Sequence, residues 1–147
     1  MSIRGFLEGV ERDSSGRDIE AVLSFDDSDI ESIHNFIQWL FPLNEASRAV
    51  PNAPILSAQD ILEISSSKAS KLNLLRASEW YLGFLDRNKH WITKYNHNHL
   101  RITRVIKSIR LLAGDHEAEN FRTKIFELLG DEKFRIDPKA VSFWLNS

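Results

Sequence analysis

The chain has 147 residues, of which 42% are hydrophobic, enough to form one domain around a single sizeable core. It contains no cysteine, which excludes disulfides, thiol nucleophiles and cysteine-based metal sites and leaves only His and carboxylates as metal ligands. Neither a membrane-spanning apolar run nor a leader with a cleavage site is present, so we expect a cytoplasmic protein with no membrane span. No cofactor is expected.

The net charge of −2 conceals a separation of charge along the chain. Residues 8–31 carry nine acidic and two basic side chains, a net −7, whereas residues 68–112 carry ten basic and two acidic side chains, a net +8. Two interpretations stay open. The two segments neutralise each other in the folded protein, or the basic segment forms an anion-binding surface.

Helix start and stop signals recur along the chain, whereas alternation of β-branched residues never runs far. The N-terminal segment is irregular, with a turn at RDSSGRD and a short helix near residues 19–23. Ser28 followed by Glu31 has the pattern of a capping box, which predicts a helix over residues 29–42 that is stopped by a proline.

Further helices are expected over residues 58–64, 67–87, 99–113, 117–129 and 138–145. Ser57 caps the first of these, Gly114 closes the third, and Asp137 with Pro138 starts the last. In the fourth, we expect core positions at Phe121, Ile125 and Leu128. The predicted fold is all-α: a compact single-domain bundle of about five to six helices over residues 1–147, with an irregular N-terminal segment.

Residues 34–43 read HNFIQWLFPL. On a helical wheel, one face of the helix expected here gathers Ile30, Ile33, His34, Ile37, Leu40 and Phe41. Trp39 falls opposite that face, and we expect it to be buried, because exposure would forgo the stabilisation that a large aromatic side chain contributes. Either the helix is central, with Asn35 and Gln38 hydrogen-bonded to loops, or the edge formed by Asn35, Gln38 and Trp39 faces a cleft and orients a ligand.

Residues 97–114 read HNHLRITRVIKSIRLLAG, with an apolar stripe and a basic side. Arg101 lies on the margin of the stripe and is expected to be partly buried. Because residues three apart are neighbours on a helix, Arg101 and Arg104 can present two guanidinium groups to one anion or one acidic loop. A solvated basic face is the alternative.

The letters HNH at residues 97–99 do not by themselves predict a metal site. Side chains two apart on a helix do not converge, so metal binding by His97 and His99 would need further ligands. We expect Asn98 to cap the following helix instead. For His34, the alternatives are a core histidine and an acid or base.

These stretches resemble the conserved N-terminal domain of the opioid growth factor receptor family. The similarity lies in DIESIHNFIQWLFPL at residues 29–43 and HNHLRITRVIKSIRLL at residues 97–112, and with a weaker upstream stretch it covers about residues 6–130. The resemblance implies a mainly helical domain. The named member of the family binds an enkephalin-type peptide and associates with nuclei. This chain looks like a short stand-alone member of bacterial or otherwise minimal type.

We expect a non-enzymatic ligand- or peptide-binding or regulatory module, whose ligand is a peptide or an anionic small molecule. Its candidate binding residues are His34, Asn35, Gln38, Trp39, Asn98, Arg101 and Arg104. One alternative is an enzyme that acts on a small anionic substrate with His34 as acid or base. Another is a nucleic-acid-binding domain that uses residues 68–110, although the overall acidity disfavours it. No catalytic residue and no metal ligand are assigned.

Overall fold

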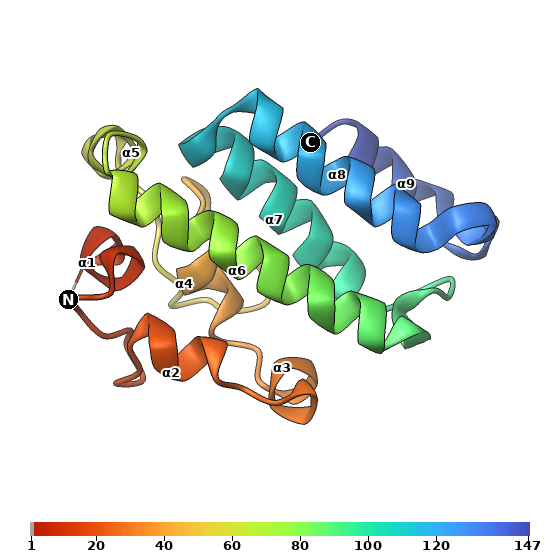
Figure 1. The fold of residues 1–147 in the computed structure, drawn as a ribbon, viewed down its shortest axis with the longest axis horizontal. Helices are drawn as coiled ribbons and strands as arrows, with labels where there is room; N and C mark the ends of the chain where they lie inside the picture. The colour runs from red at the N-terminus through yellow and green to blue at the C-terminus, as the bar shows by residue number, and fades with distance from the viewer. Residues whose placement is uncertain (1) are drawn as a thin grey trace. The chain divides into compact units, whose positions relative to one another are not determined.

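The computed structural model describes residues 2–147, and within them it contains helices but no strand (Figure 1). The α-helices are α1 (Ile3–Glu8), α2 (Ile19–Leu23), α3 (Asp27–Ser32), α4 (Ile37–Leu40), α5 (Ala58–Ser65), α6 (Lys68–Arg87), α7 (Asn98–Ala113), α8 (Asp115–Leu129) and α9 (Pro138–Leu145). The 3-10 helices are η1 (Lys89–Trp91) and η2 (Gly130–Arg135). These elements confirm the all-α fold class. None of the described helices is long and apolar enough to cross a membrane.

The chain divides into two compact units, Met1–Ala77 and Ser78–Ser147, named here the N-terminal unit and the C-terminal unit. Helix α6 begins in the first and ends in the second. The organisation of residues 1–147 as a single domain stays a prediction.

Helix α1 was not expected from the sequence. It begins after Ser2, whose hydroxyl accepts a hydrogen bond from the Gly5 N–H at 2.9 Å. It ends at Gly9, which has φ +84°, a conformation that favours glycine. Six residues are too few for hydrophobic periodicity to reveal a helix, so only its two caps could have indicated it.

The helix predicted over residues 29–42 is wrong as a continuous element. Helix α3 starts after Asp26, whose carboxylate accepts a hydrogen bond from the Asp29 N–H at 2.8 Å, so Asp26 is the cap and Ser28 is not. The backbone is extended at Ile33, and α4 begins only after Phe36. Asn35 lies in the break, and its side-chain and backbone oxygens accept hydrogen bonds from Arg17. Such hydrogen bonds compete with the helical backbone pattern, which is why asparagine often interrupts a helix.

The break changes which side chains of this stretch are buried. His34 lies in the non-helical link and is exposed, so its predicted place on a core stripe is wrong. The burial of Trp39 is confirmed, because its side chain is only 6% exposed. The Trp39 ring packs against Phe6 with centroids 5.5 Å apart, where α1 contacts α4.

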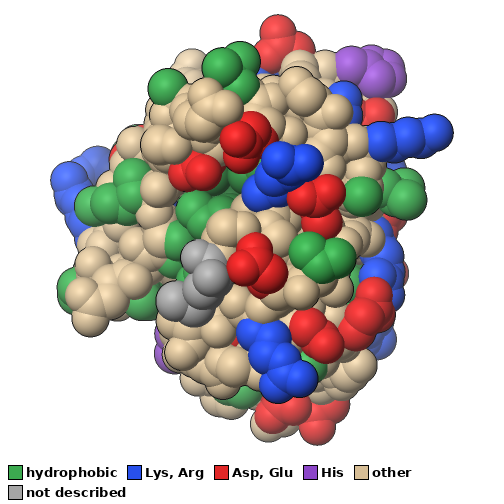
Figure 2. All heavy atoms as spheres, turned by 90° about the vertical axis from the view of Figure 1, so that its left-hand side faces the viewer, with side chains coloured by type: hydrophobic (Ala, Val, Ile, Leu, Met, Phe, Trp, Pro, Cys, Tyr) green, Lys and Arg blue, Asp and Glu red, His purple; other side chains and the backbone are tan. Residues whose placement is uncertain are grey.

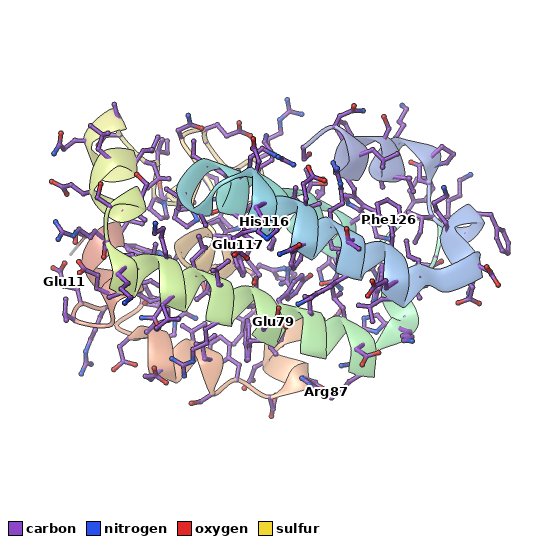
Figure 3. The ribbon with its side chains drawn as sticks, turned by 45° about the horizontal axis from the view of Figure 1, so that its top comes forward. Glu11, Glu79, Arg87, His116, Glu117 and Phe126 are labelled. Atoms are coloured by element: carbon purple, nitrogen blue, oxygen red, sulfur yellow. The ribbon has the colours of Figure 1, made fainter. Side chains whose placement is uncertain are left out.

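In the C-terminal unit, α7 packs against both α8 and α9, as Figure 1 shows. Trp144 on α9 is fully buried, and its ring lies 5.6 Å from the imidazole of His99 and 6.3 Å from Phe126, which Figure 3 labels on α8. The Trp144 indole N–H donates to the His99 carbonyl oxygen at 3.1 Å. On α8 the buried leucine is Leu129, whereas Leu128, predicted for the core, is half-buried.

Most helix ends in the second half of the chain lie where the sequence places them. Gly114, with φ +102°, closes α7, and Asp137 with Pro138 starts α9, as predicted. The cap at the start of α7 is different. Asn96 accepts the Asn98 N–H at 2.9 Å, so Asn96 takes the capping role expected of Asn98.

Some acidic side chains of residues 8–31 pair with basic side chains of the same N-terminal unit. Arg76 on α6 donates to both carboxylate oxygens of Glu20 at 2.5 and 2.7 Å, which lowers the pKa of Glu20 and raises that of Arg76. Figure 2 faces the side on which Figure 1 draws α1 and α5, and acidic side chains stand there among basic ones. On α1, Arg4 pairs with Glu8 at 2.7 Å. Local pairing therefore accounts for some of the separated charge.

Candidate functional site

A cavity of about 160 Å³ lies in the N-terminal unit, named here the amide pocket. Three segments line it, and the lining residues are Ser14, Asn35, Gln38, Trp39, Val50, Asn52, Ala53 and Pro54. Three of the seven predicted binding residues, Asn35, Gln38 and Trp39, are thus brought together at one cavity. His34, in contrast, is not among the lining residues.

The first wall of the amide pocket is held by the loop of residues 13–17. Asp13 is only 3% exposed, and one of its carboxylate oxygens accepts the N–H groups of Ser15 at 2.9 Å and Arg17 at 3.0 Å. Its other oxygen accepts from the Arg17 side chain at 2.8 Å. Gly16 provides the positive φ, +77°, that this tight loop requires. Ser14 is therefore fixed at the pocket by its neighbours.

The same arginine orients Asn35. Its Nη2 donates to the Asn35 side-chain oxygen at 3.0 Å, and the Asn35 amide nitrogen donates to the Ser15 hydroxyl at 3.4 Å. The Arg17 guanidinium also lies over the ring of Phe25 at 5.6 Å. Both ends of the Asn35 amide are thus engaged within the protein, which makes Asn35 a rigid part of the wall.

Gln38 differs from Asn35 in this respect. It is only 6% exposed, and its buried side-chain oxygen has no hydrogen-bond partner within residues 2–147. Leaving a buried acceptor unsatisfied costs about 1–3 kcal/mol. Native proteins retain few such groups, and a ligand is one of the reasons for keeping one. The Gln38 oxygen is thus sealed in the pocket wall without a protein partner.

The third wall comes from the loop before α5, and its Val50, Ala53 and Pro54 side chains are apolar. The loop is held by a turn in which the Ala53 N–H donates to the Val50 carbonyl oxygen at 3.0 Å. Beyond it, Leu43 and Ile55 form an isolated parallel bridge. Apolar side chains together with three amides, from Asn35, Gln38 and Asn52, and an indole have the composition of a small ligand site.

The remaining predicted residues lie in the C-terminal unit. Asn98 is fully buried, accepts the Tyr81 hydroxyl at 2.6 Å and donates to the side-chain oxygen of Asn96 at 2.9 Å, so it braces the start of α7. Arg101 is 7% exposed, which confirms its expected burial, and its Nη1 lies 3.5 Å from the Asn98 side-chain oxygen. Arg104 is half-buried. A single site shared by residues 29–43 and residues 97–112 stays a prediction.

Two other hollows belong to the C-terminal unit. One, of about 560 Å³, is lined by apolar side chains that include Leu100 and Phe143, together with His99. Burial lowers the pKa of His99, while its hydrogen bond to the Trp91 carbonyl oxygen at 2.7 Å and the nearby charge of Asp137 oppose that shift. Within the described part of the chain, no three His, Asp or Glu side chains gather as metal ligands.

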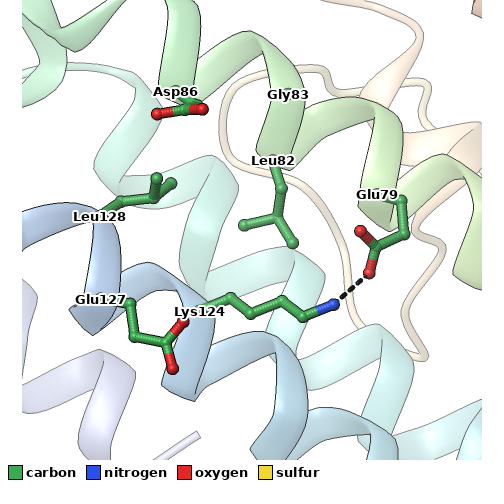
Figure 4. Close-up of a pocket in the computed structure, with 7 residues that line it drawn as sticks. All are labelled: Glu79, Leu82, Gly83, Asp86, Lys124, Glu127 and Leu128. Carbon is green, nitrogen blue, oxygen red and sulfur yellow. Dashed lines mark hydrogen bonds and ion pairs between the residues drawn. The ribbon is translucent and has the colours of Figure 1, made fainter.

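The second hollow, of about 400 Å³, lies where α6 faces α8 and is shown in Figure 4. Its carboxylates come from Glu79, Asp86 and Glu127. Lys124 crosses the hollow and donates to Glu79 at 2.6 Å. The Glu79 carboxylate thus already has a counter-charge, which makes this hollow a weaker candidate than the amide pocket.

Sequence reasoning missed the parts of the site that depend on contacts distant in sequence. No sequence motif indicates that Arg17 bonds to Asn35, which lies eighteen positions away. One local signal existed, because Asp13 and Arg17 flank a Gly-containing turn at a spacing that lets the carboxylate close the loop. The loop of residues 50–54 carried no signal for a pocket wall.

The site lies inside a region shared with known proteins. The model of the opioid growth factor receptor (OGFr) conserved region matches residues 13–89, a range that contains all the residues lining the amide pocket. The chain is 35% identical to the mouse opioid growth factor receptor over 105 aligned positions, which cover 59% of this chain and 16% of that protein. It is 27% identical to opioid growth factor receptor-like protein 1 of Xenopus tropicalis over 152 positions, which cover 89% of this chain and 28% of that protein.

The chain spans less than a third of the length of these two curated relatives. No solved structure matches it. The conserved region extends over more than half of the 147 residues and includes the HNFIQWLFPL stretch. The chain therefore belongs to the opioid growth factor receptor family.

Proposed function

We propose that this chain is a non-enzymatic binding module and that its amide pocket holds one group of a peptide or small-molecule ligand. The observation that supports this most directly is that Asn35, Gln38 and Trp39, three of the binding residues predicted from the sequence, line one cavity. The polar lining residues Ser14, Gln38 and Asn52 can hydrogen-bond a ligand group, and the Trp39 indole offers a broad apolar surface.

A peptide is the favoured ligand class. Some relatives that share this region, such as the mouse protein, are named opioid growth factor receptor, and the pocket-lining residues lie within the shared region. The cavity of about 160 Å³ is smaller than the roughly 300–1,000 Å³ of sites that enclose a drug-sized molecule. It therefore suits one terminus or one side chain of a peptide, with the rest of the peptide lying outside the cavity.

The alternatives receive less support. An acid or base at His34 would act from an exposed side chain that does not line the pocket. Nucleic-acid binding rests on the basic run alone, and part of that run is already neutralised, because Arg110 pairs with Asp115 at 2.9 Å and with Glu119 at 2.7 Å. Arg101 and Arg104 remain candidates for holding an anionic part of the ligand.

Calorimetric titration of the full chain with an enkephalin-type peptide tests the proposal. We expect the peptide to bind, and Gln38→Met to weaken binding at least tenfold, because Met keeps the approximate size of the side chain and removes its acceptor. Gln59→Met is the matched control, since Gln59 is exposed on α5. Equal affinity of the two variants would refute a binding role for Gln38, and no binding by any form would refute the peptide as ligand.

A further inference from the structure

We infer that the larger hollow of the C-terminal unit is the docking site of a protein partner that presents an amphipathic helix with acidic flanks. This hollow, of about 560 Å³, is named here the apolar hollow, and its lining includes Tyr95, His97, Leu100, Lys139, Ala140 and Phe143. All of its lining residues lie beyond residue 89, outside the conserved region that the family model matches. The inference therefore goes beyond the function proposed for the amide pocket and does not depend on it.

The walls of the apolar hollow are fixed by the protein itself. They come from residues 95–97, the first turns of α7 and the first turns of α9, and α7 packs against α9 (Figure 1). The Asp137 N–H donates to the Lys94 carbonyl oxygen at 3.1 Å, which joins the chain before α7 to the start of α9. The buried Trp144 indole donates to the His99 carbonyl oxygen at 3.1 Å. A partner would therefore meet a surface that is already formed, which lowers the entropic cost of binding.

Three large side chains at the apolar hollow are exposed. Leu100 is 70% exposed, Tyr95 is 69% exposed and Phe143 is 57% exposed, and all three line the hollow. Single exposed apolar residues are ordinary, but several that gather at one hollow mark an interaction surface. A site for a small molecule encloses about 70–90% of its ligand. Lining residues that are more than half open to solvent suit a protein segment, which covers them from outside.

The surrounding structure favours a helix as the segment that docks. An extended peptide gains its affinity by adding a strand to the exposed edge of a sheet, and residues 2–147 contain no strand. A helix satisfies its own backbone hydrogen bonds and brings only side chains to the contact. Its apolar stripe, at positions i, i+3, i+4 and i+7, can lie in a groove between two helices such as α7 and α9.

The charges around the apolar hollow favour an acidic partner. Lys139 lines the hollow and is exposed, and the exposed Lys94 holds its ammonium 5.3 Å from the centre of the Tyr95 ring. Asp137 also lines the hollow, but it is half-buried and its carboxylate caps α9 by accepting the Lys139 backbone N–H at 3.3 Å. Residues 78–147 carry twelve Lys and Arg and nine Asp and Glu side chains, a net charge of +3. Complementary charge of this kind steers partners and excludes those of the wrong sign.

The first test compares two designed peptides of about 18 residues, long enough to form a helix in water. Both carry Leu at positions i, i+3, i+4 and i+7, and the flanking positions are Glu in one peptide and Lys in the other. NMR of the full chain follows the Leu100 methyl and Phe143 ring resonances. We expect the Glu peptide to shift both in a saturable manner and the Lys peptide to bind at least tenfold more weakly. Absence of binding by the Glu peptide, or equal affinity of the two peptides, would overturn the inference.

Exchanging exposed residues locates the contact without threatening the fold. Leu100→Gln should weaken binding of the Glu peptide at least tenfold, whereas Leu72→Gln, at a leucine of α6 that is 66% exposed, should leave it unchanged. Lys139→Glu should weaken it several-fold more than Lys133→Glu, which makes the same change of charge at an exposed residue of η2. Unaltered binding in Leu100→Gln would show that the peptide docks elsewhere.

Other occupants of the apolar hollow give different results. Self-association of the full chain in sedimentation velocity, removed by Leu100→Gln, would assign the hollow to a second copy and overturn the inference. Octanoate that bound there as tightly as the Glu peptide would make it a small-molecule site, with the same consequence. Gln38→Met should leave binding of the Glu peptide unchanged, so failure of this inference is distinguishable from failure of the proposed function.

Discussion

At the scale of single residues, Gln38 and Asn35 show how two amides in one wall differ. Asn35 exchanges hydrogen bonds with Arg17 and Ser15, whereas the buried oxygen of Gln38 has no partner within residues 2–147. The first residue holds the wall in place, and the second lowers the stability of the ligand-free fold. Under the proposed function, stability and binding are in opposition at Gln38.

Replacing Gln38 should make this opposition measurable. Gln38→Met removes the unsatisfied acceptor at nearly constant volume, so we expect the free energy of unfolding to rise by about 1–3 kcal/mol. The measurement is the midpoint of urea denaturation for the full chain. Gln59→Met should change it by less than about 0.5 kcal/mol. A lowered midpoint for Gln38→Met would mean that the native glutamine oxygen is hydrogen-bonded.

Trp39 makes the opposite contribution, because it is buried and packs on Phe6. Trp39→Ala should destabilise the fold by about 3–5 kcal/mol, since it removes a large buried side chain and leaves a cavity. Tyr95→Ala, at an aromatic side chain that is 69% exposed, is the control and should have little effect on the melting temperature. A melting temperature that Trp39→Ala leaves unchanged would be incompatible with the packing described.

At the scale of elements, the N-terminal unit relies on a loop as much as on its short helices. The ion pair between Asp13 and Arg17 closes residues 13–17, and the same arginine reaches Asn35 in the break between α3 and α4. The sequence indicated a turn here, since Asp, Ser and Gly favour one. The sequence did not indicate the break between α3 and α4, because Ile33 and His34 fit a helical pattern. The hydrogen bond of Arg17 to Asn35 overrides that local pattern.

Asp13→Ala should therefore destabilise the protein by about 3–5 kcal/mol, because it leaves the largely buried Arg17 without its carboxylate. Thermal denaturation gives the stability, and the Trp39 indole resonance reports on the pocket. Asp131→Ala, at an exposed aspartate of η2, is the control. If Asp13→Ala melted like the wild type, the loop would not depend on the ion pair.

Where α7 meets α9, His99 should make stability depend on pH. Burial lowers the pKa of His99 below its ordinary 6.5, so the unfolded chain takes up a proton at a higher pH than the folded chain does. Stability is then full above about pH 6.5 and decreases as the pH falls from that value towards the lower folded pKa.

Urea denaturation at several pH values measures this effect. His99→Gln keeps a side-chain N–H for the Trp91 carbonyl oxygen and should flatten the pH dependence in this range. His116→Gln, at an exposed histidine of α8, should retain it. A wild-type stability that rises as the pH falls from 6.5 would show the opposite shift in the pKa of His99.

At the scale of the whole molecule, the sequence predicted what local signals determine. Local sequence signals located α2 and α5 to α9 closely, and the stabilisation gained by burying a large aromatic side chain predicted a buried Trp39. The pocket could not be predicted because its walls come from three segments that are separated in the sequence. The hydrogen bond of Arg17 to Asn35 and the burial of Gln38 follow only from the folded structure. Asn35, Gln38 and Trp39 were identified as candidates because an amide pair and an indole at one edge can orient a ligand and stack on it.

The most direct test of the central claim, that the amide pocket is the ligand site, is to locate an enkephalin-type peptide by intermolecular NOEs in the full chain. We predict NOEs from the peptide to the Trp39 indole and to the methyl groups of Val50 and Ala53, which line the pocket. NOEs confined to Leu100 and Phe143, in the larger apolar hollow of the C-terminal unit, would contradict the claim and place the ligand there instead.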